Sequence, residues 1–424
     1  MPTTLQGIAN KARNSRKHCF QNLYSLLNYS NLRECFFELK KNAAPGVDLV
    51  DWYDYQVNLE DNLQTLVETL KAGGYRAKLV RRKYIPKGNG KVRPLGIPCL
   101  EDKLVQRLVA KILEAIYEQD FLDFSYGYRP GKSPQGATQD LARDLQFGPY
   151  GWVVEADIRG FFDSIDHEWM LRMLKERIGD EKLLRLICKW LKAGILETDG
   201  KIIDPETGSP QGGIISPILA NVYLHYALDL WFDRLVKPTY SGRAKLTRYA
   251  DDFVCIFHYR RDAEDFYNRL GDRLAKFKLS LALDKTRKIQ FSRFRVGEGS
   301  FEFLGFEFRW GLNQKKSPQV WRWTARKKLR AALQRLKDWV RKTRCHRIRE
   351  LMRSLKAKYQ GHRNYYAVIG NSRRVSSFEH FGNSIVLKWL NRRSQRRSYN
   401  WAGFQNLLRQ FKVGNFGNSG EKAA

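Results

Sequence analysis

Hydrophobic and polar positions follow two different periods along this chain, and together they predict a mixture of helices and strands. Between residues 101 and 118, apolar side chains recur in pairs four apart, which predicts a helix with one buried stripe. Residues 20–41 and 54–71 are also expected to be helical. From 324 to 360 the pattern is helical and strongly basic. Its apolar face is predicted to hold Leu329, Leu333, Leu336 and Val340.

Three other segments have the pattern of extended chain. Residues 84–98 place a Gly-Asn-Gly turn between two short apolar pieces rich in cations, which predicts a β-hairpin. Residues 152–158 form a short apolar run, and residues 246–257 form two apolar runs separated by an Asp-Asp pair. Both look like buried strands that carry carboxylates at their ends.

Composition narrows the class of protein. With 424 residues and 43% hydrophobic side chains, the chain can bury two or three cores, which excludes a mainly disordered protein. No apolar run approaches the ~18 to 20 residues that span a bilayer, so we expect neither an integral membrane protein nor a membrane partner.

The charge is strongly positive and unevenly placed. The net charge is +32, and residues 311–424 hold 28 Lys and Arg against 4 Asp and Glu. Tryptophan and tyrosine are interleaved with these cations. Phosphates attract such cations and bases stack on such rings, so the composition favours nucleic acid over acidic lipid as the partner.

The six cysteines are scattered without a C-x-x-C pair, so neither a disulfide framework nor a zinc module is indicated. A reducing cytosol fits this pattern. The first acidic residue is Glu34, after a basic N-terminal stretch. That stretch resembles an organellar transit peptide, but similar basic segments recur along the chain, which favours a basic arm of the mature protein.

Three carboxylates are the strongest candidates for chemistry. Asp251 and Asp252 are adjacent acids between two apolar runs, and Asp157 ends another run. Buried acids are costly, and a pair of hard divalent cations held by oxygen ligands would stabilise them and serve phosphoryl or nucleotidyl transfer. A plain hairpin turn with solvated acids is the alternative for the Asp-Asp pair.

Four motifs in order resemble those of reverse transcriptases. Residues 248–252, Arg-Tyr-Ala-Asp-Asp, resemble the Tyr-x-Asp-Asp signature, and residues 156–167 resemble the first palm motif. Residues 208–223 resemble the block between them, and Phe-Leu-Gly-Phe at 303–306 resembles the primer grip. Flanking segments extend the resemblance to the reverse transcriptase and maturase proteins of bacterial group II introns. These flanks are residues 44–48, 93–98, 361–366 and 389–393.

The resemblance implies a role for each matching residue. Asp157 and Asp251 would be the principal metal ligands, assisted by the carbonyl of Ile158 and by Asp252. Phe162 would be the steric gate that excludes the 2′-hydroxyl and so favours dNTP over rNTP. The residues that would contact the incoming nucleotide are Gln211, Lys87 and Arg93.

Other residues in or near these motifs receive a structural interpretation. Asp163 and Asp166 match the first palm motif but not its metal position, so we expect caps or surface acids, and Phe161 is expected in the core. Lys285 is only a weak candidate for a general acid toward pyrophosphate and is left outside the catalytic set. The histidines expected to pack or cap on palm helices are His167 and His225.

The resemblance implies an α+β, right-hand polymerase: an RNA-directed DNA polymerase that uses two Mg²⁺, with Mn²⁺ as a substitute. It would copy group II intron RNA, bind an RNA template with a DNA primer, target DNA and dNTPs, and assist splicing and mobility within a cytoplasmic bacterial ribonucleoprotein. The chain lacks His and Cys after His380, so an endonuclease-lacking form is expected.

The domain boundaries follow from the same resemblance. The expected order is an N-terminal extension (1–44), fingers and palm with an antiparallel sheet (45–314), a helical thumb or maturase domain (315–395) and a basic DNA-binding end (396–424). Two alternatives stay open: an RNA-binding splicing factor or chaperone that uses this fold as a scaffold, and a reverse transcriptase recruited to phage defence.

Overall fold

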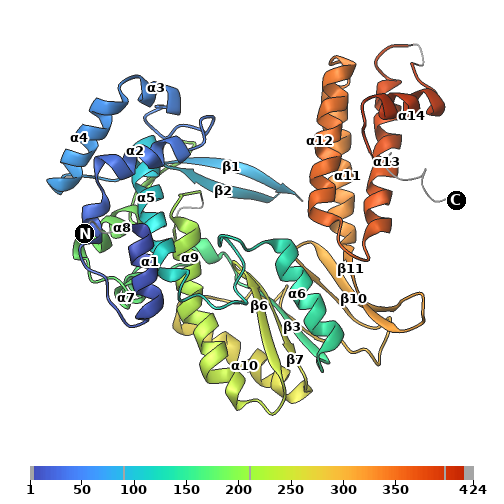
Figure 1. Cartoon of the computed structure of the whole chain (residues 1–424). Coiled ribbons are helices and arrows are strands. Elements are labelled where there is room, and N and C mark those ends of the chain that lie inside the picture. Colours follow the sequence, from blue (N-terminus) through green and yellow to red (C-terminus); the bar gives the residue numbers. More distant parts are fainter. Residues whose placement is uncertain (1–3, 89–90, 210–211, 396–397, 415–424) are drawn as a thin grey trace. The chain divides into compact units, whose positions relative to one another are not determined.

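The computed structural model describes residues 4–88, 91–209, 212–395 and 398–414. The chain folds into two compact units (Figure 1). The first unit contains residues 1–133, 156–255 and 261–287, and the second contains 134–155, 256–260 and 288–424. None of the described helices combines the length and the apolar character that crossing a bilayer requires.

Helices form most of the first unit. Its α-helices are α1 (Leu5–Asn14), α2 (Tyr29–Glu38), α3 (Trp52–Val57), α4 (Leu59–Lys71), α5 (Leu100–Tyr117), α7 (His167–Lys175), α8 (Glu181–Leu191), α9 (Ser216–Leu224) and α10 (Arg260–Lys276). Its 3₁₀ and π segments are η1 (Leu23–Leu26), η2 (Phe161–Asp163), η3 (His225–Asp229), η4 (Trp231–Val236) and η5 (Lys237–Thr239).

The chain also forms two four-stranded sheets. One has the order β2-β1-β4-β5, in which β1 (Val80–Gly88) and β2 (Lys91–Ile97) form the predicted antiparallel hairpin. The other has the order β6-β7-β3-β8. Its strands are β3 (Trp152–Asp157), β6 (Ala244–Tyr249), β7 (Asp252–Phe257) and β8 (Arg287–Gln290), while β4 (Ile195–Leu196) and β5 (Ile202–Ile203) complete the first sheet.

Helix α5 lies at the centre of the first unit and contacts α1, α2 and α9 (Figure 1). The predicted apolar stripe is buried, and so are the polar side chains of Asp102, Lys103 and Gln106. Each has a partner. Asp102 accepts from the hydroxyl of Tyr75, and Lys103 Nζ donates to the carbonyl of Ala44 at 2.6 Å. The Oε1 of Gln106 accepts from the backbone amide of Ile214. The helix therefore joins neighbouring segments through hydrogen bonds as well as through packing.

The prediction of a helix over 20–41 was wrong in its first half. Asn22 has a left-handed φ of 56°, residues 23–26 form only the 3₁₀ turn η1, and α2 begins at Tyr29 after Asn28, whose side chain accepts from the amide of Asn31. The polar side chain thus caps a new helix instead of continuing an old one. The predicted helix over 54–71 is likewise divided at Asn58 into α3 and α4.

The second unit combines a sheet with a bundle of helices. Its antiparallel sheet has the order β11-β10-β9, formed by β9 (Ser300–Phe303), β10 (Phe306–Leu312) and β11 (Pro318–Thr324). The helices are α6 (Pro134–Phe147), α11 (Arg326–Thr343), α12 (Ile348–Tyr366), α13 (Ser372–Leu390) and α14 (Trp401–Gln410). The predicted apolar face of α11 packs into the bundle core, where Leu329, Leu336 and Val340 are buried.

All six cysteines are free thiols. Cys35, Cys99 and Cys255 are buried, whereas Cys19 and Cys345 are exposed. A Cβ at Gly46 would lie 2.5 Å from the Cα of Cys99, so only glycine lets residues 44–48 pass this close to the start of α5.

Buried His225 makes stability depend on acidity. Its side chain packs 5.5 Å from the ring of Phe121, and its Nδ1 has no hydrogen-bond partner in the described part of the chain. Burial, followed by the charges of Arg248, Arg234 and Arg129, lowers the pKa of His225 from 6.5 to about 3. Below pH 6.5 the unfolded chain therefore binds a proton that the folded chain refuses, and stability falls as the pH drops toward 3.

We expect His225→Phe to remove this acid sensitivity. At pH 5 the penalty on the wild type is about 2 kcal/mol relative to pH 7.5, because the unfolded imidazole is protonated and the folded one is not. Thermal unfolding at the two pH values measures it, with the exposed His346→Phe as the control. If both variants lose as much stability at pH 5 as the wild type, His225 does not carry the effect.

Candidate active site

Two of the predicted acids lie in one cavity of the first unit. Asp157 is the last residue of β3, and Asp251 lies in the turn between β6 and β7. Both line a cavity of about 970 Å³. Its other lining residues are Val92, Arg93, Pro94, Leu95, Tyr128, Ile158, Arg159, Gly160, Phe161, Phe162, Asp163, Gly212, Gly213, Ser216, Pro217, Ala282, Asp284 and Lys285.

A tight turn presents Asp251 to the cavity. Ala250 has a left-handed φ of 57°, a costly conformation for a residue with a Cβ. Gly127 packs directly on this turn, since a Cβ there would lie 2.3 Å from the amide nitrogen of Ala250. The turn is held by close backbone packing on one side and by hydrogen bonds on the other.

Those hydrogen bonds come from Arg248, which is fully buried. Its Nε and Nη2 donate to the two carboxylate oxygens of Asp229 at 2.7 and 2.5 Å, forming a bidentate ion pair with no exposed side-chain surface. Its Nη1 donates to the carbonyl of Ala250 and to Asn221 Oδ1, each at 3.1 Å, and Nη2 also donates to Ser125 Oγ at 2.7 Å. One guanidinium thus fixes the position of the turn.

The electrostatics of the cavity suit a cation. Burial raises the pKa of Asp251, the negative charge of Asp157 raises it further, and Arg93 and Lys285 act in the opposite direction. Lys285 forms an ion pair with Asp157, and this hydrogen bond is the main reason why the pKa of Lys285 is raised. Two carboxylates that repel each other at one site, with oxygen donors only, fit a hard divalent cation.

The third acid takes a different position. Asp252 is the first residue of β7 and is not among the described residues that line the cavity. Within the described ranges, no three His, Cys, Asp or Glu side chains gather as ligands of one ion. The structure therefore brings together Asp157 and Asp251, with Ile158 beside them, and leaves Asp252 outside the cavity wall.

Phe162 faces the same cavity as Asp157, and a glycine explains how. β3 ends at Asp157, and three residues later Gly160 adopts a left-handed φ of 53°, directly before η2 begins. Phe161 turns into the core with 2% exposure, as expected, whereas Phe162 is half-buried at the cavity wall. The carbonyl of Phe162 accepts from the amide of Ser209 at 2.8 Å, so the loop at 208–209 holds this backbone in place.

The β1–β2 hairpin supplies the cation Arg93, which is exposed at the cavity wall and acts electrostatically on Asp251. Lys87 lies near the tip on β1, but its side chain is outside what the structure describes, and Gln211 is outside the described residues altogether. Beside Gln211, a Cβ at Gly212 would lie 2.5 Å from the carbonyl of Gly96, so the loop touches the hairpin backbone directly.

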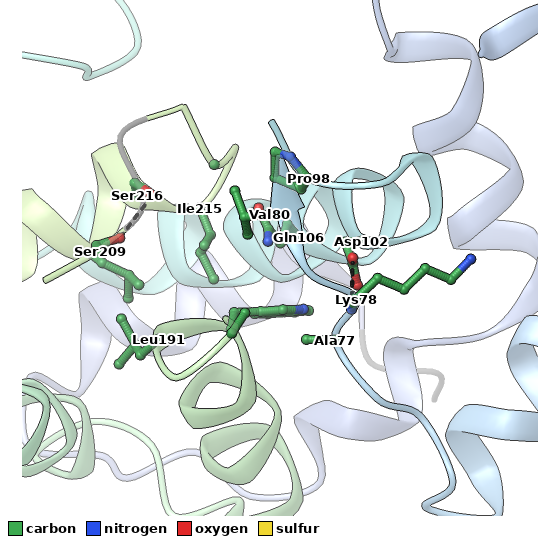
Figure 2. A pocket seen from close by; sticks show the side chains of 14 residues that line it. Ala77, Lys78, Val80, Pro98, Asp102, Gln106, Leu191, Ser209, Ile215 and Ser216 are labelled. Atoms are coloured by element: carbon green, nitrogen blue, oxygen red, sulfur yellow. Dashed lines mark hydrogen bonds between the residues drawn. The ribbon is translucent and has the colours of Figure 1, made fainter. Parts of the chain in front are cut away.

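Figure 2 shows the contacts of the described residues on either side of positions 210 and 211. The Ser209 Oγ donates to the Ser216 Oγ at 2.8 Å, and the Ile214 amide donates to Gln106 Oε1 at 3.0 Å. The cavity beside these contacts has a volume of about 10 Å³, which is enough for roughly one water molecule. The serine pair thus ties residues 209 and 216 together, and α5 anchors residue 214 through Gln106.

The remaining motif residues have structural positions. Asp166 caps α7 by accepting from the amide of Trp169 at 2.9 Å, and it pairs with Lys278 at 2.6 Å. His167 is buried, and its Nε2 lies 2.7 Å from the carbonyl of Gly208. Asp163 lies at the cavity wall in η2. The predicted cap and the predicted packed histidine are confirmed.

Sequence reasoning set aside Lys285 and did not identify Arg248 as structural. Lys285 is 128 residues from Asp157 along the chain, yet the two form an ion pair in the cavity. No spacing pattern connects residues so far apart. The signal for Arg248 was present in the sequence: a cation inside an apolar strand needs a buried acid to pair with.

A match to a known protein family includes all the described residues that line the cavity. Residues 85–308, slightly more than half of the chain, match the family described as "Reverse transcriptase (RNA-dependent DNA polymerase)". The Group II intron-encoded protein LtrA of Lactococcus lactis subsp. cremoris is 47% identical over 182 residues, which are 41% of this chain and 30% of LtrA. Protein YkfC of Escherichia coli (strain K12) is 39% identical over 276 residues, 58% of this chain and 72% of YkfC.

Among solved structures, telomerase from Candida albicans, in complex with a fragment of telomeric RNA, matches with a TM-score of 0.45 and 14% identity. That match covers 85% of this chain and 68% of the telomerase chain. The chain spans less than a third of the length of LtrA.

We expect Asp229→Ala to destabilise the first unit by about 3 to 5 kcal/mol, because it leaves the guanidinium of Arg248 buried without its anion. Chemical denaturation measures the loss. Asp233→Ala is the matched control: its surface pair with Lys237 is 3.2 Å long and exposed, so about 0 to 1 kcal/mol is expected. Equal losses of stability in the two variants would show that burying an ion pair does not make the loss of its acid more costly.

Proposed function

Because the chain belongs to the reverse transcriptase (RNA-dependent DNA polymerase) family, we propose that it synthesises DNA from dNTPs on an RNA template. The observation that carries the proposal is the pair of carboxylates, Asp157 and Asp251, which approach from two strands at one cavity wall. A phosphoryl-transfer site requires negative oxygen donors of this kind beside a cavity open to a large polyanionic substrate.

Family membership and the matches to LtrA and YkfC confirm two predictions. One is the α+β fold class of a right-hand polymerase, and the other is the relationship with group II intron-encoded proteins. The domain boundaries remain a proposal: an extension to residue 44, fingers and palm over 45–314, a thumb over 315–395, and a DNA-binding end from 396.

The metal requirement of this proposal is two Mg²⁺ ions, with Mn²⁺ as a substitute. Asp157 and Asp251 would be the principal ligands, with the carbonyl of Ile158 and, secondarily, Asp252 as further oxygen donors. Bound there, divalent cations would favour ionisation of the primer 3′-hydroxyl and offset the charge of the leaving pyrophosphate.

The chain's own residues orient the substrates in this proposal. Arg93 and Lys87 on the β1–β2 hairpin would hold the triphosphate, and Gln211 would contact the nucleotide. Lys285 forms an ion pair with Asp157, and its ammonium group at the cavity wall adds positive charge where phosphate must lie. Phe162 would pack below the sugar.

The proposed RNA partner is the group II intron itself, bound to assist its splicing and mobility, and the proposed DNA partner is the target site, all within a cytoplasmic ribonucleoprotein. The support lies in the basic bundle of the second unit. Trp389 lies 5.4 Å from the guanidinium of Arg344 and 5.4 Å from that of Arg392, and Lys358 lies 4.7 Å from the ring of Trp339. Such basic aromatic surfaces suit phosphates and bases together.

A splicing factor that merely retains the fold has no need of acids at the cavity wall. Since Asp157 and Asp251 both line the cavity, the enzymatic proposal is preferred.

We expect Asp251→Asn to lower primer extension on an RNA template by more than about a hundredfold, because the neutral amide removes one of the two charges that would bind the cations. RNA affinity should stay close to that of the wild type. Primer extension with varied Mg²⁺, together with equilibrium RNA binding, measures both. Asp163→Asn, in the same cavity but in the first palm motif, is the control and should keep its activity. Normal extension by Asp251→Asn refutes the assignment.

Phe162→Ala should admit rNTPs, since removing the ring opens space for the 2′-hydroxyl. Single-nucleotide insertion of dNTP and rNTP gives the ratio of kcat/KM, which we expect to fall by at least about tenfold. Phe161→Leu, a change in the core beside it, serves as the control. Unchanged discrimination in Phe162→Ala would place the gate elsewhere.

A further inference from the structure

Tyr128 stands out among the residues of the cavity. Its side chain is large and aromatic, yet the residue is 50% exposed. It lines the cavity together with Asp157, Phe162 and Asp251. Its hydroxyl has no hydrogen-bond partner within the described ranges. None of the motifs shared with reverse transcriptases contains this residue, and half of its surface is open to solvent.

The backbone of Tyr128 is strained. Its φ of 58° is left-handed, a conformation that is unfavourable for a residue with a bulky side chain. Such a conformation persists only where the surrounding structure imposes it, and it is enriched at ligand-binding positions.

The chain on either side of Tyr128 imposes that conformation. Before it, residues 124–126 add to the edge of β6: the Arg248 amide donates to the carbonyl of Phe124 at 2.9 Å, and the Tyr126 amide donates to the carbonyl of Arg248 at 2.8 Å. The Asn221 Nδ2 donates to the carbonyl of Gly127 at 2.6 Å.

After Tyr128, the guanidinium of Arg129 fixes the chain. Its Nη1 donates to the carbonyls of Leu122 and Ser125, each at 2.8 Å, and its Nε pairs with Glu118 at 3.0 Å. The backbone that carries the ring of Tyr128 is therefore hydrogen-bonded to β6, the strand that leads into the Asp251 turn.

The ring also has a neighbour. Tyr249, the tyrosine just before the Ala250–Asp251 turn, lies with its ring centre 6.4 Å from that of Tyr128 at an angle of 47°. The two rings are therefore neighbours: Tyr128 lines the cavity with the acids, and Tyr249 ends β6 two residues before Asp251. Aromatic side chains provide stacking platforms for bases irrespective of sequence.

We propose that Tyr128 is a substrate-contact residue: with Tyr249 it forms an aromatic platform for the terminal base pair of the primer–template duplex. The inference rests on the proposed polymerase function, because that reaction requires the primer 3′-hydroxyl to lie beside Asp157 and Asp251. A pair seated on the platform would place its terminal sugar next to the acids. The contact is with base and sugar surfaces, so it is independent of sequence.

The test uses Tyr128→Gly in the full chain. Glycine adopts a left-handed φ without strain, so this variant deletes the ring while keeping the backbone. We expect the Kd for a primer–template duplex, measured at equilibrium without dNTP, to rise about tenfold, within the range for loss of one stacked base. The KM for dNTP at saturating duplex should stay within about twofold of the wild type.

Two further variants complete the design. Tyr128→Phe keeps the ring and should bind duplex as the wild type does. Leu49→Gly relieves a similar left-handed strain (φ 60°) at an exposed, uncharged position before α3, so it reports the effect of strain relief alone and should leave the duplex Kd unchanged. Thermal unfolding of each variant confirms that it is folded.

Each result has a defined meaning. An unchanged duplex Kd for Tyr128→Gly overturns the proposal, as does a rise confined to the KM for dNTP, which would assign the ring to the incoming nucleotide. Weak binding by Tyr128→Phe would overturn it too, since the hydroxyl would then be the contact. If the wild type binds duplex but extends no primer, the proposed polymerase function fails, while the duplex Kd still decides the role of Tyr128.

Discussion

The buried ion pair between Arg248 and Asp229 is the constraint on which the cavity depends. Charges are costly to bury, and this pair is tolerated because the bidentate contact and the additional hydrogen bonds satisfy the guanidinium. In return, one side chain links η3, α9, the edge segment at Ser125 and the turn at Ala250. The position of Asp251 is thereby set by contacts that lie behind it, away from the space where a substrate must bind.

The chemistry of the cavity is a balance between like and unlike charges. Asp157 and Asp251 repel each other, and burial adds to the cost of ionising Asp251. Lys285 offsets part of this cost through its ion pair with Asp157. The ammonium group of Lys285 ends a flexible four-carbon stem, so it can balance negative charge at the cavity wall and still move aside for a substrate.

Sequence reasoning was most successful where a local pattern determines structure. The α5 stripe, the turn sequence of the β1–β2 hairpin and the short apolar runs of β3, β6 and β7 are local signals, and the observed elements agree with them. Asp157 and Asp251 were identified because family motifs marked them. The helix expected over 20–41 was wrong because asparagine at positions 22 and 28 redirects the backbone, and propensity alone gives little weight to single capping residues.

What could not be predicted are the contacts between distant segments. The pairing of Lys285 with Asp157, the anchoring of the 209–216 loop by Gln106 and the strained ring of Tyr128 all depend on how the chain is brought together in three dimensions. None of them leaves a period or a motif in the local sequence, because each partner is more than a hundred residues away or belongs to a turn whose φ is set by its neighbours.

The distribution of thiols has a practical consequence. Cys19 belongs to the first unit and Cys345 to the second, and both are exposed, whereas three of the other four are buried. After replacement of the partly accessible Cys188, maleimide dyes would attach at one natural position in each unit. Energy transfer between the two dyes would then report, molecule by molecule, how the separation of the units changes when RNA is added.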